Sequence, residues 1–125
     1  MIIGVGCDII EIERISQAIE RNTFIKRVFA PAEITYCRSR GIQAAASFAA
    51  RFAAKEALLK AFGTGLRGGR LQEIIIINDD AGKPQVELQG FFAVLAKQLG
   101  VQKINISLSH ARNLAMAYIV MEDGK

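Results

Sequence analysis

The sequence feature that most constrains the fold is a stretch of 20 residues without glycine or proline, QAAASFAARFAAKEALLKAF, at positions 43–62. Alanine and leucine favour the helical state, and at 1.5 Å per residue this segment would form a helix roughly 30 Å long. We therefore predict that it is the central helix of the domain. The segment is mostly apolar, yet it carries Arg51, Lys55, Glu56 and Lys60, and these charges need an explanation.

The rest of the chain predicts shorter elements around this helix. IIGVGC at positions 2–7 predicts a buried strand, and isoleucines at helical spacing predict a helix that begins soon after Asp8. Pro31 predicts the start of a helix within residues 29–40. The second half predicts, in order, a strand at 71–79, a strand at 85–88 that completes a hairpin, a helix at 90–100, and strands at 103–110 and 114–122. We expect an α+β fold, with helices packed on a small, largely antiparallel sheet, in one domain over residues 1–125.

Composition limits the classes of protein that this chain can belong to. Hydrophobic residues make up 51% and charged residues 22%, which is typical of a globular domain. No apolar run reaches the roughly 18 residues that a membrane span needs, and the N-terminus has no basic leader before Asp8. Cys7 and Cys37 have no metal-binding or redox spacing, so we expect two free thiols in a reducing, cytoplasmic compartment.

The positive charge is concentrated in one region of the chain. Between Arg14 and Arg70, 11 Lys or Arg residues occur with 3 acidic residues, a net +8 within a total of +4. Residues 1–13 carry 3 acids and no base, and residues 71–125 carry 5 bases and 6 acids. This segregation is compatible with an anionic partner and equally with a solvated basic face.

Two carboxylates are candidates for chemistry. Phe48, Phe52, Glu56 and Lys60 are spaced four apart, so they share one stripe of the central helix. Glu56 and Lys60 can be a surface ion pair, or Glu56 can be a functional carboxylate at the edge of the core. Asp8 can be a helix N-cap, or a hard oxygen ligand for Mg²⁺ with Glu56 as the second carboxylate. Two carboxylates are too few for an all-protein cage, which suits a magnesium ion that arrives with a phosphorylated substrate.

Two further features leave their role open. The segment GTGLRGGR contains a GxGxxG pattern, but it follows a helix, so the dinucleotide-binding interpretation fails on context. Gly63 can be the left-handed residue that ends the helix, or the loop, with Arg67 and Arg70, can approach a phosphate. The lone histidine, His110, follows Ser109 at the end of a predicted strand, and a structural role and an anion-facing role are both open.

Two motifs resemble those of a known family. GVGCDIIEIERI resembles the G-x-D-x5-R opening of the 4′-phosphopantetheinyl transferases, and RFAAKEALLKAFGTG resembles their second motif, W/F-x-x-K-E-x-x-x-K. The short length, the GKP turn and the terminal SLSH resemble the holo-acyl-carrier-protein synthase branch. The resemblance runs from Ile3 to about Val120. Cys7 and Ala50 stand where relatives often have other residues, and neither affects the expected chemistry.

The resemblance implies a reaction. Enzymes of this branch move 4′-phosphopantetheine from coenzyme A to a serine hydroxyl of apo-acyl carrier protein and release adenosine 3′,5′-bisphosphate. By motif position, Asp8, Glu56 and Lys60 would be catalytic, with Mg²⁺ bound by Asp8 and Glu56. Lys60 would contact the coenzyme A phosphates, and Glu56 would help to take the serine proton, directly or through water.

The resemblance also implies binding residues and an assembly. Coenzyme A would be held by Arg51, Lys60, Gly63, Gly65, Lys83, Pro84, Ser109 and His110. Acyl carrier protein would dock on Arg14, Arg21, Phe24 and Arg27. Family members are typically homotrimers with sites between subunits, so the Lys83–Pro84 turn and the Ser109–His110 strand end would serve a neighbour's site.

Two competing hypotheses follow from the basic region. The first is a nucleic-acid-binding module without catalytic activity, motivated by an isoelectric point near 9.3 and the segment GLRGGR. An aromatic content of 7% and the lack of an RNA-binding or helix-turn-helix signature count against it. The second is a subunit whose basic face serves only assembly, with Glu56 and Lys60 as a structural pair. We expect neither a nucleic-acid partner nor a membrane partner.

Overall fold

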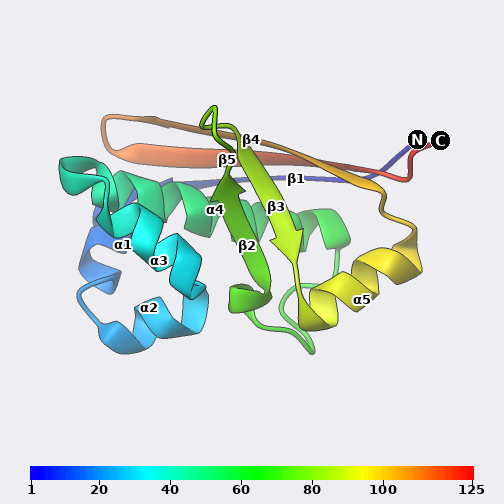
Figure 1. Ribbon diagram of the computed structural model, residues 1–125, viewed down its shortest axis with the longest axis horizontal. Coiled ribbons are helices and arrows are strands. Elements are labelled where there is room, and N and C mark those ends of the chain that lie inside the picture. Colours follow the sequence, from blue (N-terminus) through cyan, green and yellow to red (C-terminus); the bar gives the residue numbers. More distant parts are fainter.

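A three-stranded antiparallel sheet with one long helix packed on it forms the centre of the molecule (Figure 1). The computed structural model describes residues 1–125. The strands follow the order β1–β5–β4, so β5 is the middle strand. The bounds of these elements are β1 Ile2–Glu11, β4 Lys103–Ala111, β5 Leu114–Glu122 and α4 Ala44–Phe62.

The predicted central helix is confirmed, and its end has a clear cause. Gly63 adopts a left-handed conformation with φ of 75°. Its N–H donates a hydrogen bond to Leu59 O at 2.9 Å, which satisfies a carbonyl at the end of the helix. Of the two roles considered for Gly63, helix termination is therefore confirmed.

The sheet prediction needs one correction, because the structure has two antiparallel sheets and not one. Strands β2 (Ile74–Asn78) and β3 (Pro84–Leu88) form the predicted hairpin, which is not hydrogen-bonded to the three-stranded sheet. Helix α5 (Gly90–Leu99) follows the hairpin. The ring of Phe92 in α5 stacks on Phe62 at the end of α4, with centroids 5.8 Å apart, which ties the second half of the chain to the central helix.

The helix predicted after Asp8 is present, but it begins later than expected. Strand β1 continues through Glu11, because residues 8–11 pair with residues 114–117 of β5. Ile10 points into the core from this extension, and the first helix begins only at Ile12. Asp8 therefore lies within a strand and is not a helix N-cap.

Three short helices connect β1 to α4. The second of them was not predicted, since its sequence has neither a capping side chain nor a proline at its start. Residues 71–73, predicted as strand, form a 3₁₀ turn in which the Glu73 side chain accepts a hydrogen bond from Arg70 N at 2.9 Å. The helices are α1 Ile12–Ala18, α2 Asn22–Val28 and α3 Pro31–Arg38.

Strand β1 lies in direct backbone contact with α4. Gly4 faces Ala61 and Gly6 faces Ala57, and a methyl group added at Gly6 would lie 1.9 Å from Ala57 O. Two strand residues advance about 6.6 Å and four helix residues about 6 Å, so alternate residues of β1 meet successive turns of α4. Asp8 is the next residue on this face of the strand, and the small side chains beside it let α4 approach closely.

The remaining expectations concern the thiols and the membrane. Cys7 and Cys37 are both free, the first exposed and the second buried. None of the helices combines the length and the apolar character that crossing a membrane would require.

Candidate active site

Strand β1 and helix α4 bring Asp8, Glu56 and Lys60 together. The Lys60 Nζ donates hydrogen bonds to Asp8 Oδ1 at 3.1 Å and to Cys7 O at 3.0 Å, although Lys60 and Asp8 are 52 residues apart in the chain. The Lys60 side chain remains 57% exposed and the Asp8 side chain 19% exposed. The cluster is therefore fixed by the contact of strand and helix and is open to solvent on one side.

The electrostatics of Glu56 reflect this arrangement. Burial raises the pKa of the Glu56 carboxyl, and the negative charge of Asp8 raises it further, while the Lys60 ammonium lowers it in part. Two carboxylates that repel each other in a half-buried position are a favourable place for a cation. The sequence prediction that Asp8 and Glu56 lie close together is consistent with this pKa shift.

The donor set fits a magnesium ion that brings other ligands with it. Asp8 and Glu56 provide hard carboxylate oxygens, which Mg²⁺ prefers. No group of three or more His, Cys, Asp or Glu side chains converges anywhere in the chain. A pair of carboxylates leaves most of an octahedral shell to water and phosphate oxygens, as is usual where Mg²⁺ binds together with a phosphorylated substrate.

A groove of about 410 Å³ lies beside the cluster, between α1, α2 and α4. Phe52, one turn before Glu56, forms part of it, and its ring centroid is 6.0 Å from that of Phe24. Of the four predicted carrier-binding residues, three line this groove, and Arg27 is exposed on α2 outside the lining. The lining residues are Ile10, Arg14, Ile15, Gln17, Ala18, Arg21, Phe24 and Phe52.

Arg51 and His110 line a second cavity, of about 340 Å³, together with Tyr36 and Arg40. The Arg51 side chain is buried, donates to Ser47 Oγ at 3.1 Å, and stacks on the Tyr36 ring with Cζ 4.4 Å from the centroid. Its Nε is buried without a hydrogen-bond partner. A cavity with two guanidinium groups and an imidazole has the chemistry of an anion site.

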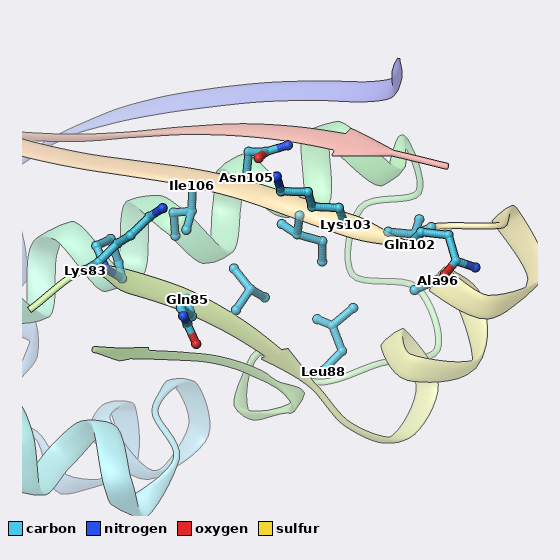
Figure 2. A pocket seen from close by; sticks show the side chains of 12 residues that line it. Lys83, Gln85, Leu88, Ala96, Gln102, Lys103, Asn105 and Ile106 are labelled. Carbon is cyan, nitrogen blue, oxygen red and sulfur yellow. The ribbon is translucent and has the colours of Figure 1, made fainter. Parts of the chain in front are cut away.

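The other predicted coenzyme A residues lie in separate hollows of the chain. Gly63 lines a cavity of about 420 Å³ beside the glycine loop. Lys83 and Pro84 line a cavity of about 560 Å³ between β3 and β4, and Figure 2 shows Lys83 at the end remote from Gln102. Ser109 is exposed on β4. A single chain therefore does not gather all the predicted coenzyme A residues around Asp8 and Glu56.

Sequence reasoning missed the positions of two residues. Lys55, the first lysine of the second motif, is fully buried and forms an ion pair with Glu33. Tyr36 lies between the guanidinium groups of Arg40 and Arg51, with Cζ 5.6 Å and 4.4 Å from its ring centroid. The contacts of Lys55 with Glu33 and of Arg51 with Tyr36 have no local signal, since the partners lie on different helices.

Comparison with known proteins gives a consistent result. Residues 4–119 match the 4′-phosphopantetheinyl transferase superfamily, described as ACPS. The chain is 50% identical over 123 residues to a holo-[acyl-carrier-protein] synthase of Clostridium tetani, covering 98% of this chain and 97% of that protein. It is 47% identical over 125 residues to the holo-[acyl-carrier-protein] synthase of Geotalea daltonii, covering 98% and 99%.

Solved structures agree with the sequence comparison. The holo-[acyl-carrier-protein] synthase of Neisseria meningitidis superposes with a TM-score of 0.89 at 32% identity, covering 98% of this chain and 99% of that one. The enzyme of that name from Bacillus anthracis, in complex with coenzyme A (3′,5′-ADP), gives a TM-score of 0.83 at 32% identity, with 99% of both chains covered. The predicted α+β fold of this family is thereby confirmed.

Proposed function

The chain belongs to the 4′-phosphopantetheinyl transferase superfamily, among the holo-[acyl-carrier-protein] synthases, and we propose that its reaction takes place at the cluster of Asp8, Glu56 and Lys60. The enzyme transfers 4′-phosphopantetheine from coenzyme A to a serine hydroxyl of apo-acyl carrier protein and releases adenosine 3′,5′-bisphosphate. The observation that carries the proposal is the hydrogen bond of Lys60 to Asp8 from distant segments beside a groove, with Glu56 near enough for the charges of both to act on its pKa. The nucleic-acid-binding alternative is set aside. We also propose that residues 1–125 act as one catalytic domain.

The three side chains have distinct roles. Asp8 and Glu56 hold Mg²⁺, which when bound screens the diphosphate charge and stabilises the leaving bisphosphate. Lys60 directs its exposed ammonium at the same phosphate oxygens, and its hydrogen bonds to Asp8 and Cys7 fix it before substrate binds. Glu56 takes the serine proton, directly or through one water molecule. The half-buried position of Glu56 supports this role, because burial makes the carboxylate a better base.

The anionic nucleotide end of coenzyme A binds in the cavity of Arg51 and His110. The support is its cationic lining and the unpartnered Nε of Arg51. Gly63 and Gly65 pass close to the diphosphate after the end of α4. The Lys83–Pro84 turn and the Ser109–His110 strand end serve the site of a neighbouring subunit, and the support is that Lys83 and Pro84 line a cavity apart from Asp8 and Glu56.

We propose that the enzyme is a homotrimer with sites between subunits. The support is the outer face of the three-stranded sheet, where apolar side chains are exposed in register on adjacent strands. Ile9 is paired with Met116, and both are exposed. An apolar face of this kind is typical of a surface that another subunit covers. The exposed large residues on it are Val5, Ile9, Leu114, Met116 and Tyr118.

Acyl carrier protein docks at the groove beside Glu56. Acyl carrier proteins are acidic, and Arg14 and Arg21 provide positive charge at the edge of this groove. Phe24 and Phe52 give it an apolar floor next to the cluster. Arg27 adds charge on the same helix as Phe24, further from the groove.

The test is the variant Glu56→Gln, assayed by the mass shift of apo-acyl carrier protein with coenzyme A and Mg²⁺. We expect turnover to be nearly abolished while the circular dichroism spectrum is unchanged. Glu87→Gln is the matched control, because Glu87 is exposed on β3 and belongs to no proposed site. Near-normal turnover by Glu56→Gln would remove both its metal role and its role as base.

A further inference from the structure

A fully buried ion pair lies directly behind the catalytic face of α4. Lys55 Nζ and Glu33 Oε1 are 2.7 Å apart, and both side chains have no solvent exposure. Lys55 immediately precedes Glu56 in the helix. Successive residues of a helix point roughly 100° apart, so the direction of Lys55 determines the direction of Glu56.

The polar atoms of both side chains have hydrogen-bond partners, which lie at the start of α3, in the 3₁₀ turn at residues 71–73 and in β2. Besides Glu33, the Lys55 ammonium donates to Leu71 O at 2.9 Å and to Ile74 O. Glu33 Oε1 also accepts the N–H of Ala30 at 2.9 Å. Its other oxygen, Oε2, accepts the N–H of Ile76 at 3.0 Å. The pair therefore joins α4 to the start of α3 and to the edge of β2.

Away from its contact with β1, helix α4 is packed largely through small side chains, which specify its rotation less sharply than a buried ion pair does. It is buried on almost all sides, and most of the buried side chains are alanine. Alanine ridges present similar surfaces at neighbouring rotations, whereas a buried ammonium needs its acceptors at fixed points. A buried ion pair contributes little net stability compared with apolar residues of similar size, but it can specify one arrangement.

We propose that Glu33 and Lys55 form a positioning pair that fixes the rotation of α4, so that Glu56 faces Asp8. Neither residue touches substrate or metal. The inference rests on the proposed role of Glu56, and it assigns a purpose to the first lysine of the motif that the reaction itself does not use. It also explains why the motif places this lysine next to the carboxylate.

The test replaces the whole pair by apolar residues of similar length, in the double variant Glu33→Leu/Lys55→Met. This change leaves no unpaired buried charge, but it removes the hydrogen-bond partners of Leu71 O, Ile74 O and the N–H groups of Ala30 and Ile76, so we expect a folded protein with a lower melting temperature. We expect kcat to fall about 100-fold, because misplacing a catalytic group by about 1 Å costs that much. We expect the Kd for Mn²⁺, measured by electron paramagnetic resonance with coenzyme A present, to rise about tenfold. The KM for acyl carrier protein should not change.

A matched control makes the same exchanges on the surface. Glu87 and Lys97 are both exposed, on β3 and α5, and the double variant Glu87→Leu/Lys97→Met should retain the original kcat and Mn²⁺ affinity. A folded Glu33→Leu/Lys55→Met protein with kcat and Mn²⁺ affinity within about twofold of the original overturns the proposal, since misplacement predicts a far larger loss.

Two further variants keep the outcome interpretable. If the apolar pair does not fold, Glu33→Gln keeps the size of the side chain and removes its charge, and we expect an intermediate loss of kcat. A folded Glu33→Gln protein with unchanged kcat and Mn²⁺ affinity overturns the proposal as well. Glu56→Gln distinguishes a failure of the positioning proposal from a failure of the proposed function. If Glu56→Gln is inactive while the apolar double variant is fully active, only the positioning proposal is wrong. If Glu56→Gln is active, the proposed function itself fails.

Discussion

The close contact of β1 with α4 predicts that Gly6→Ala separates the catalytic residues. The added methyl group would lie 1.9 Å from Ala57 O, and real contacts of this type do not fall below 3.0 Å, so strand and helix must part by at least 3.0 − 1.9 = 1.1 Å. Ala57 O is a backbone atom, so it cannot move away from the added methyl group as the end of a flexible side chain could. Asp8 is two residues further along β1, and its distance of 3.1 Å from Lys60 would then exceed 4 Å.

Gly6→Ala should affect both the free energy of unfolding and the catalytic rate, and the magnitude of each effect follows from the displacement. Overpacking of this kind costs about 1–3 kcal/mol of unfolding free energy. A displacement of about 1 Å at a catalytic group costs about 100-fold in rate. We therefore expect a folded enzyme whose kcat is reduced about 100-fold and whose melting temperature is several degrees lower.

The assay compares kcat by carrier-protein mass shift with the midpoint of thermal unfolding. Gly4→Ala is a graded control, because its methyl group would lie 2.4 Å from Ala61 O, and the required separation is only 3.0 − 2.4 = 0.6 Å. Glu87→Gln, exposed on β3 outside every proposed site, should leave kcat unaltered. A folded Gly6→Ala enzyme with the original kcat would show that the strand–helix distance does not set the carboxylate separation.

Three other predictions concern docking, titration and assembly. Arg14→Ala/Arg21→Ala should raise the KM for acyl carrier protein at low salt with a weaker effect on kcat, and an unchanged KM contradicts the docking assignment. In metal-free protein, Asp8→Asn should lower the pKa of Glu56, followed by carboxyl NMR, because a like charge is removed; an unchanged pKa would contradict their proximity. Folding raises the pKa of Glu56, so protonation of this carboxyl stabilises the folded state below pH 4.5, the ordinary value. This stabilisation is lost as pH rises from 4.5 through the pKa of the folded state. The melting temperature of Glu56→Gln should therefore fall less than that of the original protein over this pH range. Tyr118→Glu should give monomers in analytical sedimentation, and an intact trimer would place the interface elsewhere.

The elements with strong local patterns could be predicted from the sequence. The central helix was predicted to within one residue, because 20 residues without a breaker admit few alternatives. The strand at residues 114–122 was predicted with its observed bounds, since alternating side chains follow a turn. The family motifs predict Asp8 and Glu56 as site residues, but the approach of β1 to α4 depends on two glycines whose close contact with α4 has no local signal.

The elements that depend on distant partners could not be predicted. Ile9 and Ile10 fit a helix and a strand equally well, and pairing with β5 decides in favour of the strand. The hairpin of β2 and β3 and the three-stranded sheet are separate, and strand patterns do not report which strands are neighbours. The partner of Lys55 is Glu33, 22 residues earlier on another helix. The spacing of residues within α4 therefore could not predict that Lys55 is buried.

The charges on α4 can now be assigned by the surroundings of each side chain. Lys55 is fully buried with Glu33, and Arg51 is buried against Tyr36 with one nitrogen unpartnered. Glu56 is half-buried, and the Lys60 side chain is 57% exposed. A buried charge that already has all its partners cannot respond to a substrate, whereas a partly exposed one can exchange water for phosphate. The residues of this helix that can bind a ligand are therefore Glu56, Lys60 and, at the cavity that it lines with His110, Arg51, while Lys55 acts only by holding the helix that carries them.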